Sequence, residues 1–193
     1  MDATKQVLTD YLTQLREAVA WKLEDVGERA ARTPMTPSGT NLLGLVKHLG
    51  LMEFGYFGDV FGRPTDEPMA QLDADQWRQD ADLWATAEEG IAAVQGFYAR
   101  ATAHANETIG ARDLDSPAFV PWWSPDQQQT TLARIMVHVI AETARHAGHI
   151  DIIREQLDGK VGTHPEYSGP AHDAAWRAAY AARLTEIAAR APE

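Results

Sequence analysis

The sequence predicts an all-α protein, a four-helix bundle with one additional C-terminal helix. Four long segments carry apolar residues at intervals of three and four, the period of a helix with one buried face. No segment sustains the alternation of period two that marks a strand, and no linker is long enough to separate two domains. We therefore expect a single helical-bundle domain over residues 1–193, with the bundle in about 4–159 and the last helix in about 172–189.

The first two helices are expected over about 4–29 and about 40–61. Pro and Gly residues follow the first, and Gly62 and Pro64 end the second, as is typical just beyond a helix. The apolar faces consist of Leu8, Tyr11, Leu12, Leu15, Val19, Leu23 and Val26 in the first helix and Leu42, Leu45, Leu49, Met52, Tyr56 and Val60 in the second.

The third helix is expected over about 73–105 and the fourth over about 130–157. Asp73 is a suitable N-cap for the third, with Gln76 at the position that completes a capping box. The fourth ends at Asp158-Gly159, where glycine provides a C-terminal cap.

Two segments are expected to be irregular. One is the stretch over 113–126, rich in Pro and Trp, and the other precedes the last helix and contains Gly162, Pro165, Gly169 and Pro170. The order in which the helices pack is open, because the chain around the third helix is long enough for a crossover connection.

Charge and composition exclude several classes of function. The chain has 17 Lys and Arg against 28 Asp and Glu, a net charge of −11, so it lacks the basic cluster that nucleic acid or an anionic membrane surface requires. It holds no cysteine, which excludes disulfides, iron–sulfur clusters and thiol nucleophiles. The N-terminal 26 residues place charge in every turn, unlike a signal peptide or a membrane span. A soluble, cytoplasmic protein is expected.

Polar residues interrupt the apolar stripe of the fourth helix. Glu142 and His146 lie one turn apart, between Ile135 and Ile153, so their side chains rise from one face. An unpaired carboxylate inside a bundle costs several kcal/mol, and a bound divalent metal is one way to offset that cost. His48 lies on the apolar stripe of the second helix and offers a third ligand.

Three ligands on two helices would leave an open coordination position, as in a catalytic zinc site. Two His and one carboxylate also suit iron, and nickel is a further alternative. The structural alternatives are a buried His48 bonded to a carbonyl and a solvated contact between Glu142 and His146. His138, one turn before Glu142, is the competing ligand, and His149 is a candidate for orienting a ligand or contacting substrate.

Several motifs together resemble the DinB-like superfamily of four-helix-bundle metalloproteins. They are Asn41-Leu-Leu-Gly-Leu-Val-Lys-His48-Leu, Pro121-Trp-Trp-Ser and His138-Val-Ile-Ala-Glu142-Thr-Ala-Arg-His146-Ala-Gly-His149. The resemblance implies a divalent metal held by one ligand from the second helix and two from the last bundle helix. These positions fall on His48, Glu142 and His146. Many members have histidine where Glu142 stands, but mycothiol-dependent maleylpyruvate isomerase is similar in having a His, Glu, His zinc site.

The resemblance also implies a reaction. Characterised relatives use zinc with mycothiol, bacillithiol or glutathione, as S-transferases or thiol-dependent isomerases. The implied function is therefore the metal-dependent transfer of a low-molecular-weight thiol to an electrophilic small molecule in detoxification. Maleylpyruvate is not the expected substrate, because that isomerase has an extra C-terminal domain. The alternatives are a hydrolase or isomerase that uses metal-bound water, and a non-catalytic metal-binding stress or interaction protein. A homodimer is implied by the superfamily.

Four further residues are candidates for contacts with substrate. Trp122 and Trp123, in the loop before the fourth helix, could form a lid over the metal end or simply cap the core, which we favour. Arg145 could receive a carboxylate, but helical geometry turns it about 100° from His146. Tyr56 is expected in the core rather than in a cavity.

Overall fold

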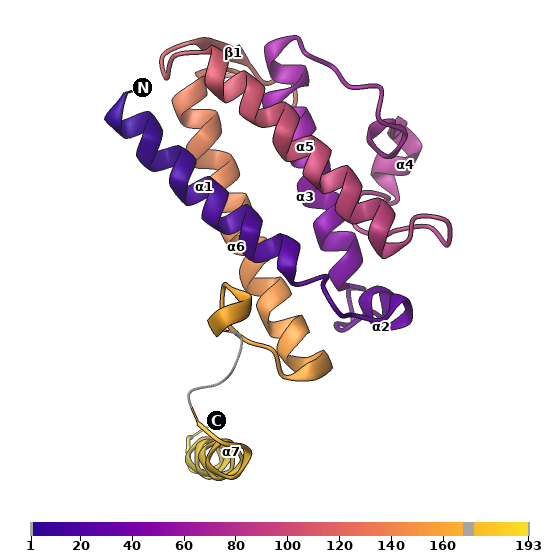
Figure 1. The fold of residues 1–193 in the computed structure, drawn as a ribbon, viewed down its shortest axis with the longest axis vertical. Coiled ribbons are helices and arrows are strands. Elements are labelled where there is room, and N and C mark those ends of the chain that lie inside the picture. Colours follow the sequence, from indigo (N-terminus) through magenta and orange to yellow (C-terminus); the bar gives the residue numbers. More distant parts are fainter. Residues whose placement is uncertain (1, 168–171, 193) are drawn as a thin grey trace.

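A computed structural model describes residues 2–167 and 172–192 of the chain. Four helices form the bundle in Figure 1: α1 (Ala3–Trp21), α3 (Leu42–Phe57), α5 (Ile91–Ala111) and α6 (Leu132–Asp158). The remaining elements are α2 (Glu28–Arg32), η1 (Asp59–Phe61), η2 (Pro68–Ala70), α4 (Ala74–Arg78), β1 (Pro117–Phe119), β2 (Gln129–Thr131), η3 (Pro165–Tyr167) and α7 (Ala174–Ala188). The all-α fold with a C-terminal helix is confirmed.

The helices α3 and α6 pack against each other in antiparallel orientation. Near the start of α3, the ring of His48 lies 4.9 Å from that of His146 between centroids. Eight residues later in α3, the ring of Tyr56 lies 4.7 Å from that of His138, which is eight residues earlier in α6. The same face of each helix is therefore turned toward the other over two turns.

The helices α3 and α5 run in the same direction. At their N-terminal ends, the Lys47 ammonium contacts the Glu89 carboxylate at 2.9 Å. At their C-terminal ends, the Thr108 hydroxyl donates to the carbonyl of Phe57 at 2.6 Å. Parallel neighbours need a connection that returns the full length of the helix, and residues 58–90 provide it. This crossover segment answers the question that the sequence left open.

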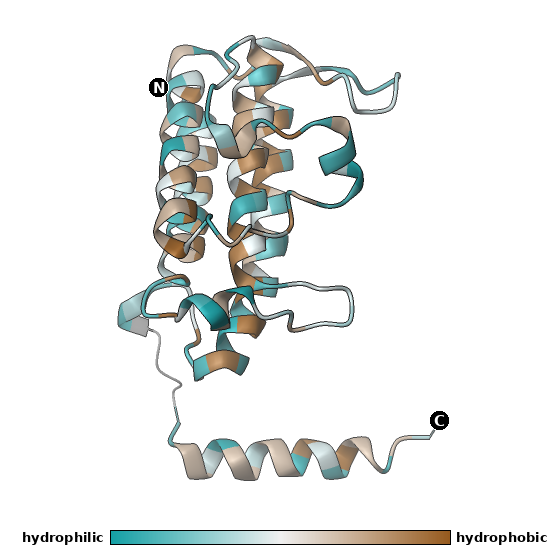
Figure 2. Ribbon diagram, turned by 90° about the vertical axis from the view of Figure 1, so that its right-hand side faces the viewer, coloured by the Kyte–Doolittle hydropathy of each residue, from teal (hydrophilic) through white to brown (hydrophobic). Residues whose placement is uncertain are grey.

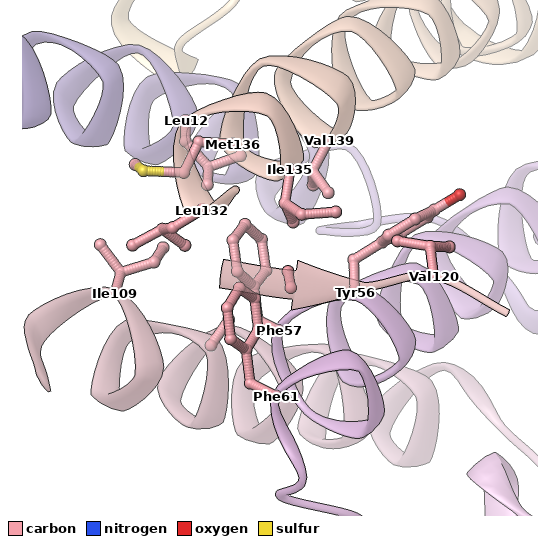
Figure 3. Packing of buried hydrophobic residues seen from close by; sticks show 12 residues of the cluster. Leu12, Tyr56, Phe57, Phe61, Ile109, Val120, Leu132, Ile135, Met136 and Val139 are labelled. Atoms are coloured by element: carbon pink, nitrogen blue, oxygen red, sulfur yellow. The ribbon is translucent and has the colours of Figure 1, made fainter. Parts of the chain in front are cut away.

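The core lies between the four helices as three clusters of buried apolar side chains. Figure 3 shows the cluster nearest the hairpin, where Leu12 from α1 meets Phe57 from α3 and Met136 from α6. The ring of Tyr56 joins this cluster, while its hydroxyl points away from the aliphatic side chains. One ion pair is also buried: the Arg16 guanidinium contacts the Glu53 carboxylate at 2.6 Å, with exposures of only 6% and 1%.

The expected third helix is not continuous, because only 74–78 and 91–105 of its expected residues are helical. The capping box of Asp73 and Gln76 is present, but α4 ends at Arg78, and Asp80 follows with a left-handed φ of 52°. A second helix, α5, begins at Ile91. Between them, carbonyl groups accept hydrogen bonds from distant side chains instead of from the next helical turn. The donors are Asn41 to Leu83, Lys47 to Trp84, and Arg32 to Ala85, Thr86 and Glu89.

The expected first helix ends early, for a similar reason. Its boundary is Trp21 rather than residue 29, and Asp25 has a left-handed φ of 58°. The buried guanidinium of Arg154 donates to the carbonyls of Lys22 at 2.5 Å and Glu24 at 2.8 Å, which fixes them outside a helix. The second and fourth expected helices agree with α3 and α6 to within a few residues.

The stretch expected to be irregular contains the first strand of a short antiparallel hairpin, whose second strand lies just beyond it and includes the first two residues of the expected fourth helix. β1 pairs with β2, with Ala118 opposite Thr130. Each strand has only three residues, too few to show a period of two.

The last expected helix is confirmed as α7, which has no buried residue and lies apart from the bundle in Figure 2. Gly169 and Pro170, expected in the loop before it, lie outside the described residues. Among the described residues, no helix is both long and apolar enough to cross a bilayer.

Candidate metal centre

Polar side chains line the contact between α3 and α6, which we call the α3–α6 seam. From α6 it contains His138, Glu142 and His146, and from α3 it contains His48 and Tyr56. Residues four apart on a helix share a face and rise about 6 Å along it, so these groups form a row rather than a scatter. The row has two ends, one at the pair of His48 and His146 and the other at the pair of Tyr56 and His138.

The orientation of His48 is set by a carboxylate from the crossover segment. Asp82 is buried, and its Oδ2 lies 2.7 Å from Nδ1 of His48. A carboxylate only accepts, so Nδ1 carries the proton, and in the neutral ring Nε2 keeps its lone pair. A histidine that binds metal usually has this arrangement, with the second nitrogen donating to a carboxylate.

The approach of Asp82 depends on a glycine in α3. A Cβ at Gly44 would lie 1.8 Å from the carbonyl oxygen of Leu83, so no larger residue fits there. The Asn41 side chain, which caps α3, also donates to the carbonyl of Leu83 at 3.2 Å. Asp82 was not among the predicted site residues, because the pattern of apolar residues places it inside the expected third helix. The glycine in Asn41-Leu-Leu-Gly was the only local signal of a close approach.

His146 has neighbours on both ring nitrogens. Its Nε2 lies 3.6 Å from Oε2 of Glu142, and its Nδ1 lies 3.4 Å from Nδ1 of His149. Burial, and after it the nearby His48, lower its pKa to about 4, so the ring is neutral at pH 7. If His146 donates from Nδ1 to His149, its Nε2 is left to face His48 and Glu142.

The donor chemistry of His48, Glu142 and His146 fits a divalent metal. Two imidazoles and a carboxylate are ligands for zinc and for iron, and each imidazole has a neighbour for its other nitrogen. In the part of the chain that the structure describes, however, no group of three or more His, Asp or Glu side chains is set to hold a metal ion. The groups are gathered at one place, and side-chain rotation would be needed to converge them.

At the other end of the seam, the Tyr56 hydroxyl joins three residues. The indole Nε1–H groups of Trp122 and Trp123 point at it from 3.2 and 3.1 Å, and Nε2 of His138 lies 2.9 Å away. Indoles only donate, so they occupy the two lone pairs and the hydroxyl proton must go to His138. His138 is therefore neutral and protonated on Nδ1, consistent with a pKa lowered mainly by burial.

The other expected site residues differ in where they lie relative to the three candidate ligands. His138, the competing ligand, contacts Tyr56 rather than His48. His149 lies next to His146, as expected, whereas Arg145 is exposed. Trp122 is half exposed and borders a cavity, and Trp123 packs partly against the core, so the two tryptophans differ in role. Tyr56 was expected in the core, and it is both buried and in contact with the same cavity as Trp122.

A family model described as Mycothiol-S-transferase matches residues 7–159, which include all of the α3–α6 seam. A search of curated proteins finds no match.

Proposed function

Because the chain belongs to the mycothiol S-transferase family, we propose that it transfers mycothiol or a similar low-molecular-weight thiol to an electrophilic small molecule. We further propose that the reaction depends on a divalent metal, zinc in the first place. The observation that carries this proposal is the gathering of His48, Glu142 and His146 at one end of the α3–α6 seam.

In this proposal the two imidazoles bind the metal through Nε2 and Glu142 binds it through its carboxylate. Asp82 would hold His48 in the correct tautomer, and His149 would do the same for His146. Three protein ligands leave a position open for the thiol sulfur. When bound, the metal supplies positive charge that lowers the pKa of the thiol and so makes thiolate available at neutral pH.

The proposed transfer is balanced without an oxidant or reductant. The thiol gives its proton to solvent, its sulfur forms a bond to the electrophilic carbon, and the leaving group departs with the electron pair of the broken bond. The thiol must come from outside, because the chain contains no cysteine. In this proposal the protein contributes position: it holds the thiol at the seam and the electrophile close to it, which converts an encounter in solution into a reaction between neighbours.

Metal content measured by elemental mass spectrometry tests this proposal first. We expect stoichiometric zinc in the purified protein and its loss in His48→Ala and in His146→Ala. His172→Ala is the matched control, since His172 stacks on Trp176 beside α7, away from the seam. The zinc-loaded protein should then consume mycothiol in the presence of chlorodinitrobenzene and release chloride.

Two results would contradict the proposal. Absence of metal after incubation with zinc, nickel or iron would remove the metal centre and leave a non-catalytic role. If the metal-loaded protein instead converts an ester or an isomerisable substrate without any thiol, the reaction uses metal-bound water rather than a thiol. Detoxification, cytoplasmic location and a homodimeric state stay predictions.

A further inference from the structure

A cavity of about 620 Å³ lies against α3, on the side covered by the crossover segment. Met52 and Tyr56 from α3 form one wall, Trp77 from α4 forms another, and Trp122 from the loop before β2 closes a third side. Its volume is in the range of cavities that enclose a drug-sized molecule.

The cavity adjoins the α3–α6 seam. Met52 lies one turn after His48 and one turn before Tyr56, on the same face of α3, and one turn is about 6 Å. Tyr56 belongs to both places, because its ring lines the cavity while its hydroxyl bonds His138. A molecule in the cavity would therefore present one end within about a turn of His48.

The lining determines which molecules the cavity would accept. It is mostly apolar and aromatic, and among the described residues that line it Asp59 is the only Asp, Glu, Lys, Arg or His. No lining cation is present to pair with an anion, and the chain as a whole carries a net charge of −11. Trp77 and Trp122 offer indole faces and edges, which favour flat, unsaturated molecules.

We propose that this cavity is the binding site for the electrophile, and that the electrophile is an uncharged, apolar molecule with an aromatic or similarly flat part. This inference rests on the proposed transferase function for the identity of the ligand as an electrophile. It adds the place of binding and the chemical class, which the metal ligands do not determine.

A glycine in the cavity wall allows a direct test. A Cβ on Gly55 would meet only the Trp122 ring, at 3.9 Å, so Gly55→Leu is compatible with α3 and fills the cavity. Gly110→Leu is the matched control: it makes the same change near the end of α5, where a Cβ meets nothing within 4 Å. Trp122→Ala is a second variant that alters the cavity from an exposed position, and so carries little risk to folding.

The first measurement is binding of dinitrobenzene, which has no leaving group, by calorimetry without thiol. We expect Gly55→Leu and Trp122→Ala to weaken binding at least about tenfold, or about 1.4 kcal/mol, and Gly110→Leu to leave it unchanged. The second is turnover with thiol, where chlorodinitrobenzene should have a higher kcat/KM than the carboxylated chlorodinitrobenzoate. Both Gly55→Leu and the control should retain full metal content.

The outcomes separate this proposal from the one on which it rests. No binding of dinitrobenzene, equal binding by Gly55→Leu, or equal turnover of the carboxylated compound would overturn the cavity assignment while transferase activity stands. If the wild type binds dinitrobenzene but transfers no thiol, and Gly55→Leu abolishes the binding, the transferase function is overturned. The cavity is then supported as a site for uncharged aromatic molecules.

Discussion

Replacing Asp82 by Asn should weaken zinc binding while leaving the fold intact. Asp82 and His48 are both largely buried, with side-chain exposures of 10% and 15%, and their contact is 2.7 Å. The amide of Asn has the same shape as the carboxylate but no charge. It can also donate to Nδ1 of His48, which would place the proton on Nε2 and block that nitrogen as a ligand.

The expected effect on affinity follows from the role of this contact. Removing a carboxylate that orients a metal-binding histidine costs about 10–100-fold in affinity, or about 1.4–2.7 kcal/mol. The free energy of unfolding of the metal-free protein should fall by about 1 kcal/mol or less, because the Asn oxygen can still accept from the Nδ1–H of His48. For a chain of this length, that corresponds to a fall in Tm of only about 2–4 °C.

Competition with a chromophoric chelator would measure the zinc affinity of wild type, Asp82→Asn and His48→Ala. Thermal unfolding of the metal-free proteins would provide the control for folding. Unchanged zinc affinity in Asp82→Asn, together with its loss in His48→Ala, would refute the orienting role of Asp82. Unchanged affinity in both variants would remove His48 from the site altogether.

Three further predictions concern stability and the neighbours of the site. Glu53→Leu leaves the buried Arg16 guanidinium without its carboxylate partner, although its bond to Asn106 stays, and should lower the free energy of unfolding in urea by about 3–5 kcal/mol. Adding Arg16→Met should restore most of this loss, and a double variant no more stable than Glu53→Leu alone would refute the prediction. In the metal-free protein the pKa of His146 is about 4 against 6.5 for a free imidazole, so the unfolded state binds more protons between these values. Stability should therefore fall as pH drops from 6.5 toward 4, and a pH series of thermal unfolding should show a shallower slope for His146→Gln. Tyr56→Phe removes the hydroxyl proton donated to His138 and should lower the free energy of unfolding by about 1 kcal/mol. Nitrogen NMR should then show that the ring proton of His138 is no longer held on Nδ1 alone.

The sequence was sufficient for those parts of the fold that local patterns determine. The capping box at Asp73 and the glycine end of α6 at Gly159 were predicted and are present. The length of the third helix was not, because nothing in a period of three and four reveals that Asn41, Lys47 and Arg32 bond the carbonyls of the crossover segment. Such contacts join residues 37 to 54 positions apart, and they override helical propensity.

In the candidate site, too, residues on helical stripes could be predicted from local patterns, whereas residues placed by loops could not. His48, Glu142 and His146 could be singled out because each is a polar residue on an apolar helical stripe, and the pairing of α3 with α6 brings His48 beside His146. Asp82 could not be singled out, since its position depends on the path of a loop. Nor could the bonds from two indoles to Tyr56, because they depend on how a Pro-rich loop folds back over α3.

The crossover connection between α3 and α5 has a consequence for how this fold could diversify. The groups proposed to bind metal lie on two rigid helices, whereas much of the cavity wall, including Trp77, belongs to the segment over 58–90. Connecting segments accept substitutions and changes of length far more readily than packed helices do. Provided that Asp82, which orients His48 from this same segment, is kept, evolution can therefore alter which molecule is accepted while the metal ligands stay as they are, so that one scaffold can supply a set of paralogues with distinct substrate ranges.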